Sequence, residues 1–118
     1  MNNFLEALKE RVVVFDGAMG TNLHAQNLTV DDFGGPQFEN CSEHLLVTRP
    51  DAVEKVHADF LAAGCDVVET NSFGGMRVVL AEFGIPEMAY ELNVAAAKLA
   101  RRVAADFSTK DRPRTCSA

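Results

Sequence analysis

The sequence has few cysteines, and they are not arranged as metal ligands or as a disulfide framework. Cys41, Cys65 and Cys116 lie far apart, are odd in number and form no CxxC or Cys/His pair at the usual zinc spacing. We therefore expect three free thiols. Cys65 begins an apolar stretch, where a small core residue is the simplest interpretation.

Long apolar runs and a basic leader are also absent. No run of apolar residues reaches the length that a membrane span needs. Residues 1–10 contain Glu6 and Glu10 and only a broken apolar pattern, unlike the basic start and continuous apolar centre of a secretory signal. We expect no membrane contact and a cytoplasmic location.

Basic residues are too few and too scattered for a nucleic-acid binder. The chain has 11 Lys and Arg against 17 Asp and Glu, a formal net charge of −6. With 118 residues, 47% of them hydrophobic and 24% charged, the composition is ordinary for a globular protein. That length supports one modest domain with a core of its own, and hardly two.

One stretch combines a predicted strand with a predicted ligand loop, the run RVVVFDGAMGT over residues 11–21. Four consecutive apolar residues, 12–15, predict a strand buried on both faces. Asp16 follows at its carboxyl end, and Gly17 and Gly20 let the backbone approach a ligand. The alternative is a simple Asp-Gly turn, with Asp16 capping the next element.

A second predicted strand, residues 65–70, ends in a similar way. The polar run Glu69 to Ser72 and two glycines follow its apolar residues. Two strands joined by a helix form a βαβ unit whose carboxyl ends share one edge, so Asp16 and this polar run should line one pocket. Its donors and acceptors suit a small zwitterion such as an amino acid. The alternative is that Thr70 and Ser72 only cap the next helix.

Capping signals and the helical period predict the remaining elements. Asn3 begins a short leading helix over residues 3–10, which could plug one end of a sheet or barrel. Thr48 begins a helix that ends at Gly64, and His57 is interpreted as a surface or rim residue of that helix. A short helix covers 75–83, and Pro86 starts a longer one that serves as scaffold.

Two segments of the chain lie outside the helices and strands predicted so far. Residues 22–47 show no sustained period and are predicted to be a long irregular insertion, either a functional βα loop or a surface excursion. Residues 115–118 stand where the alternation of strands and helices predicts a third strand.

Together, the motifs DGAMGT, TRPD, ETNSFG and NVAAAKLAR resemble the start of a homocysteine S-methyltransferase domain, over about residues 9–114. The resemblance is closest to the cobalamin-dependent members of that family. It implies an α/β fold, the N-terminal part of a (β/α)8 TIM barrel with about two to three of its eight βα units. Residues 1–118 would then form a partial homocysteine-binding domain with 22–47 as a long βα-loop insertion.

The resemblance also implies roles for five residues. Asp16 matches the acid that helps to hold the amino group of homocysteine, and Gly17 and Ala18 match the backbone beside its carboxylate. Glu69 and Thr70 match positions that line the same pocket. A carboxylate for an ammonium group and glycine amides for a carboxylate are also what a zwitterion requires chemically.

The sequence departs from the family in its catalytic parts. Family members hold zinc with three cysteines from later barrel strands, and Cys41, Cys65 and Cys116 do not match those positions. We therefore assign no catalytic residue and no metal ligand to this chain. Zinc activates the homocysteine thiol, so the chain alone is expected to be inactive, as an N-terminal fragment. Its expected partners are homocysteine and the remaining barrel, cobalamin and folate modules of a full-length enzyme.

Two other interpretations remain open. The chain could be a non-catalytic module that binds an amino acid through the DGAMGT loop. A phosphate or nucleotide site at Gly17 to Gly20 is disfavoured, because the loop lacks the GxxxxGK[ST] spacing and a nearby lysine.

Overall fold

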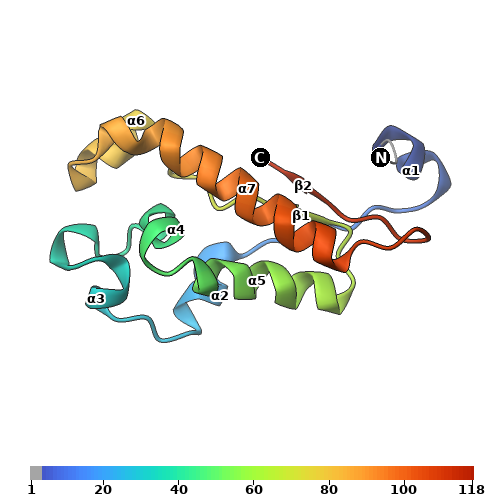
Figure 1. Ribbon diagram of the computed structural model, residues 1–118, viewed down its shortest axis with the longest axis horizontal. Coiled ribbons are helices and arrows are strands. Elements are labelled where there is room, and N and C mark those ends of the chain that lie inside the picture. Colours follow the sequence, from blue (N-terminus) through green and yellow to red (C-terminus); the bar gives the residue numbers. More distant parts are fainter. Residues whose placement is uncertain (1–3) are drawn as a thin grey trace.

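The computed structural model describes residues 4–118, and it is elongated, measuring 47 × 27 × 19 Å. Most of the described elements are helices, and two short parallel strands follow α5 and α7 (Figure 1). The helices are α1 (Phe4–Glu10), α2 (Met19–His24), α3 (Val30–Phe33), η1 (Pro36–Phe38), η2 (Ser42–His44), α4 (Leu45–Thr48), α5 (Pro50–Ala63), α6 (Arg77–Leu80), η3 (Ala81–Phe83), η4 (Pro86–Met88) and α7 (Ala89–Phe107). The strands are β1 (Val67–Glu69) and β2 (Thr115–Ser117).

The two strands form a small parallel sheet. Val67 pairs with Thr115, Val68 with Cys116 and Glu69 with Ser117. The third strand predicted at 115–118 is therefore present as β2. On the other side of β1, the extended N-terminal segment joins through a single parallel bridge between Phe15 and Val67. Strand directions and order agree with the βαβ arrangement predicted from the sequence.

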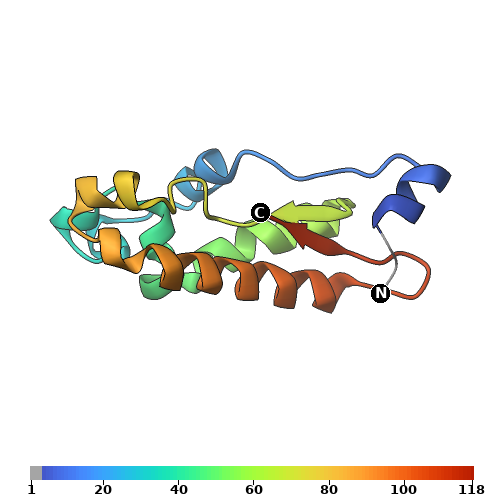
Figure 2. The same ribbon diagram turned by 90° about the horizontal axis from the view of Figure 1, so that it is seen from above.

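The prediction of a strand over 12–15 that is buried on both faces is wrong. Val12 is 82% exposed, Val14 47% and Phe15 40%. In Figure 2 this segment, drawn in blue, lies on the opposite side of the two strands from α7. Burial on both faces needs packing partners on both faces, and the described residues cover this segment mainly from the β1 side.

Helices α5 and α7 pack against each other and against the strands (Figure 1). Val68 is fully buried together with Leu61 of α5 and Ala100 of α7. A larger cluster joins the first half of both helices through Val53, Val56 and Leu92 to the segment that precedes α5. The buried residues of α5 and α7 recur at the helical period, because an amphipathic helix buries its apolar side where it packs.

Residues 22–47 are helical in large part, so the prediction that this insertion is irregular is wrong. They contain α3, η1, η2 and most of α4, and α2 begins just before them. Leu23, Cys41 and Leu45 lie in the larger core cluster. Thr29 caps α3 by accepting from the Asp32 amide, while Asp32 accepts from the Thr29 amide. Helices of four to six residues are too short to show a period in the sequence.

The C-terminal ends of two helices lie where the sequence predicted them, and the start of α5 differs. Gly64 and Gly84 adopt left-handed conformations after α5 and η3, as C-terminal glycines do. The N-cap of α5 is Arg49, because Thr48 still belongs to α4. The predicted cap Asn3 lies outside the described residues.

Helix α1 lies at the end of the molecule away from α3 and α6 (Figure 1). None of its residues is buried, although the ring of Phe4 meets that of Phe15 edge to face at 6.2 Å. Across residues 4–118, no helix combines the length and apolarity that crossing a membrane requires.

Candidate functional site

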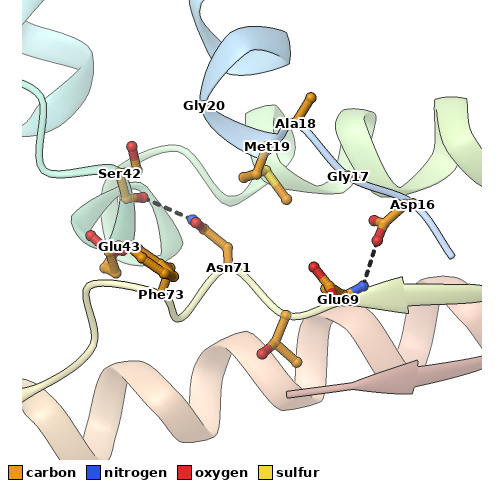
Figure 3. A pocket seen from close by; sticks show the side chains of 11 residues that line it. Asp16, Gly17, Ala18, Met19, Gly20, Ser42, Glu43, Glu69, Asn71 and Phe73 are labelled. Atoms are coloured by element: carbon orange, nitrogen blue, oxygen red, sulfur yellow. Dashed lines mark hydrogen bonds between the residues drawn. The ribbon is translucent and has the colours of Figure 1, made fainter.

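A pocket of about 340 Å³ lies where the N-terminal segment and β1 end. All five residues predicted from the sequence line it, namely Asp16, Gly17, Ala18, Glu69 and Thr70. The rest of its wall is formed by Met19, Gly20, Ser42, Glu43, Asn71 and Phe73. Figure 3 shows Asp16 and Glu69 on one side and Ser42 and Glu43 on the other, with Asn71 between them.

Asp16, at the end of the N-terminal segment, is hydrogen-bonded to the end of β1. Its Oδ1 accepts a hydrogen bond from the Glu69 backbone N–H at 2.8 Å (Figure 3). Its own N–H donates to the Val67 carbonyl at 3.0 Å. The side chain is only 3% exposed, so the carboxylate presents one edge to the pocket. Burial raises the pKa of Asp16, the Glu69 amide opposes that rise, and the Glu69 carboxylate adds to it.

The loop after Asp16 leaves space beside its backbone. A Cβ placed on Gly17 or Gly20 would meet no heavy atom within 4 Å. Ala18 adopts a left-handed conformation, φ 50° and ψ 42°, as the residue before α2. A left-handed alanine is strained and such residues are frequent at ligand sites. The loop therefore leaves open space beside its backbone at Gly17 and Gly20.

The polar run after β1 does not cap a helix. The Thr70 and Ser72 hydroxyl oxygens lie 2.6 Å apart, and the Thr70 amide donates to the Ser117 carbonyl at 2.8 Å. Helix α6 has Met76 at its N-cap, with no side-chain capping bond. The capping alternative for Thr70 and Ser72 is therefore wrong, and both belong to the loop beside the pocket. Glu69 is exposed at the end of β1.

Sequence reasoning missed the opposite wall of the pocket, which comes from η2. Glu43 is buried and accepts a hydrogen bond from the Gly74 N–H at 2.7 Å. Asn71 donates from its side chain to the Ser42 carbonyl at 2.9 Å. A buried acid in an aperiodic segment leaves no local pattern in the sequence. The glycine pair after ETNSF was the available signal, since a Cβ on Gly74 would lie 2.8 Å from a Glu43 oxygen.

His57 is buried, so its interpretation as a surface or rim residue is wrong. It is 0% exposed, and neither ring nitrogen has a hydrogen-bond partner among residues 4–118. Its Nδ1 lies 4.0 Å from Asp16 Oδ2, behind the pocket wall. Burial lowers the pKa of His57 to about 4, so the ring is neutral near pH 7 and forms no ion pair with Asp16.

The described residues do not fit a zinc site. Within residues 4–118, no group of three His, Cys, Asp or Glu side chains is placed to hold a metal ion. All three cysteines are free, as predicted. Burial raises the pKa of the Cys41 and Cys65 thiols, which opposes the thiolate form that a zinc ligand needs. We therefore place no metal on these side chains.

Comparison with known proteins agrees with this geometry. The sequence profile of the family described as Homocysteine S-methyltransferase matches residues 13–117. The chain is 44% identical over 112 residues to methionine synthase of Mycobacterium tuberculosis, and equally to that of Mycobacterium leprae. These matches cover 95% of this chain and 9% of each relative.

Solved structures show the same similarity. Homocysteine methyltransferase MmuM from Escherichia coli in its metallated form matches with a TM-score of 0.69 and 28% identity, over 89% of this chain and 35% of that protein. Its oxidized form matches with a TM-score of 0.71 and 28% identity, over 90% and 35%. The chain thus spans about a tenth of the length of the methionine synthases and about a third of the solved enzyme.

Proposed function

The chain belongs to the homocysteine S-methyltransferase family, and we propose that it supplies part of the homocysteine pocket of an enzyme that methylates homocysteine to methionine. The observation that carries this proposal is the shared pocket at the ends of the N-terminal segment and β1. It joins the carboxylates of Asp16, Glu69 and Glu43, an open glycine loop and a threonine. These groups complement the two charges of an amino acid.

The ammonium group of homocysteine is assigned to Asp16 and Glu69. Their side chains lie on the same side of the pocket (Figure 3), and Asp16 is oriented by the Glu69 amide. An ammonium beside these acids favours their ionised forms and offsets the effect of burial on Asp16. Charge-assisted hydrogen bonds of this kind are about twice as strong as neutral ones.

The carboxylate of homocysteine is assigned to the backbone of Gly17 and Ala18, where the absence of a side chain at Gly17 permits close approach. Thr70 lines the same pocket and offers a hydroxyl. The chain therefore binds and orients its substrate in this proposal, and none of its residues has a catalytic role.

The complete enzyme in this proposal is a (β/α)8 barrel of which these residues form two to three βα units. Zinc, which activates the homocysteine thiol in the family, is assigned to parts of the barrel other than these residues, because the described side chains form no metal cluster. The similarity to methionine synthases supports cobalamin as a further cofactor and cobalamin and folate modules as partners.

Isothermal titration calorimetry of the 118-residue chain with L-homocysteine tests this function. We expect binding that Asp16→Asn weakens at least tenfold, because the variant loses a charge that pairs with the ammonium group. Asp111→Asn changes an exposed acid far from the pocket in sequence and serves as the matched control. Failure of the unmutated chain to bind homocysteine would contradict the proposal.

A second candidate function is non-catalytic binding of amino acids in general, for which the carboxylates and the glycine loop of the pocket would suffice. Titration with L-serine and L-methionine separates the two. Binding of all three ligands with similar affinity supports the general module, whereas a preference for homocysteine supports the enzyme. Inorganic phosphate as a fourth ligand tests the phosphate-site interpretation of the glycine loop.

A further inference from the structure

His57 is a buried polar residue that the proposed pocket does not use. It lies in the middle of α5, is 0% exposed, and has two ring nitrogens without a hydrogen-bond partner among residues 4–118. A neutral imidazole has one donor and one acceptor, and leaving either unpaired in the interior is costly. A leucine at this position would fill the same interior without that cost, so the imidazole needs a role.

The group that faces His57 is the carboxylate of Asp16. The distance from His57 Nδ1 to Asp16 Oδ2 is 4.0 Å, and both side chains are at least 97% buried. The other oxygen, Oδ1, already accepts from the Glu69 amide at 2.8 Å. The second oxygen of Asp16, Oδ2, lies 4.0 Å from His57 Nδ1, about 1 Å beyond hydrogen-bond distance.

We propose that His57 is a positioning residue for Asp16, whose carboxylate it holds toward the pocket by donating from Nδ1–H to Oδ2. The carboxylate then has a fixed donor on each oxygen, Glu69 N–H on Oδ1 and His57 Nδ1–H on Oδ2. An ionised carboxylate only accepts, so the pair requires the tautomer with its proton on Nδ1. A contraction of about 1 Å brings the two atoms into contact.

The charges around His57 and Asp16 determine whether removal of His57 raises or lowers the pKa of Asp16. Glu69 at the end of β1 and Cys65 before β1 also interact electrostatically with Asp16, and the Glu69 charge raises the pKa of Asp16. His57 is neutral near pH 7, so it stabilises the Asp16 carboxylate by hydrogen bonding and not by charge. A donor to the ionised form lowers a carboxyl pKa. Removal of His57 should therefore raise the pKa of Asp16 and favour its protonated form.

Two NMR measurements on the chain without ligand test this role. Long-range proton–nitrogen spectra of the unmutated chain should show His57 protonated at Nδ1, and a ring protonated at Nε2 would overturn the proposal. Carbon-detected titration of the Asp16 carboxyl should show its pKa raised by about one unit in His57→Leu, a tenfold change in proton affinity. An unchanged Asp16 pKa in a folded His57→Leu would also overturn it.

Two further variants separate positioning from packing. His57→Asn keeps a donor near the place of Nδ1. In this variant the pKa of Asp16 should fall back most of the way to its value in the unmutated chain, which would not happen if His57 only filled space. His24→Asn removes an exposed histidine on α2 and should leave the Asp16 pKa unchanged. If His57→Leu does not fold, the tautomer of His57 in the unmutated chain still decides the question.

The consequence for ligand binding rests on the proposed function. The pH below which homocysteine affinity is lost should rise by about one unit in His57→Leu, the same change as in the Asp16 pKa. In His57→Asn it should fall back toward the value of the unmutated chain. If the unmutated chain binds no homocysteine, the proposed function fails, while the tautomer and the Asp16 pKa still decide whether His57 positions Asp16.

Discussion

The Glu43 carboxylate accepts a hydrogen bond from the backbone N–H of Gly74, with 2.7 Å between the two heavy atoms. The two residues are far apart in sequence, one in η2 and the other in the loop after β1. Both are buried. This bond joins the two walls of the pocket, because η2 supplies Ser42 and Glu43 and the loop supplies Asn71 and Phe73.

Gly74→Ala should destabilise the chain through this contact. The new Cβ would lie 2.8 Å from Glu43 Oε1, so the carboxylate must move and lose its bond to the Gly74 amide. We expect a loss of about 1–3 kcal/mol in the free energy of unfolding, measured by urea denaturation. Gly17→Ala is the matched control, since its Cβ meets nothing within 4 Å. Equal losses in both variants would contradict the prediction.

Acid stability should depend on Asp66, a buried residue next to β1. Burial opposes its ionisation, but hydrogen bonds from Arg11, the Val14 N–H and Arg112 lower the pKa of Asp66 to about 2. Arg11 Nη1 lies 2.8 Å from Oδ2 and Arg112 Nε 3.3 Å from Oδ1. Because the pKa is lower in the folded state, the stabilisation is complete above the ordinary value of 3.8 and disappears as pH falls toward 2.

The measurement is the unfolding free energy of Asp66→Asn relative to the unmutated chain between pH 7 and pH 2. At pH 7 the variant should be less stable by about 1–2 kcal/mol, a value reduced by solvent screening of the two partly exposed arginines. The difference should shrink below about pH 4. Asp111→Asn, at an exposed position, should show no such trend. A difference that stays constant with pH would refute this assignment.

Because Ala18 has a left-handed backbone conformation, Ala18→Gly should change the free energy of unfolding very little. A left-handed alanine is strained by about 1–2 kcal/mol, which offsets the entropic cost of introducing glycine. Thermal unfolding should show a change below about 0.5 kcal/mol for Ala18→Gly and a loss of about 1 kcal/mol for Ala97→Gly, on the exposed side of α7. A similar loss at both positions would show that Ala18 is unstrained.

Much of the site was predictable because its residues stand at the ends of strands. Asp16 follows the first extended segment and Glu69 ends β1, and parallel strands bring such ends to one edge. The wall formed by Ser42 and Glu43 was not predictable. It reaches the pocket through bonds to Asn71 and Gly74, and no local pattern records such long-range pairing.

The sequence by itself determined the local features: the helical stretches that become α5 and α7, the glycines that end helices, and the strand ends at which Asp16 and Glu69 stand. These depend on periodicity, capping and strand direction, which act within a few residues. Only the tertiary structure decided burial. It exposed Val12, Val14 and Phe15 despite their apolar side chains, and it enclosed His57 behind Asp16. Burial depends on which distant segments cover a side chain, and that is a property of the whole packed chain.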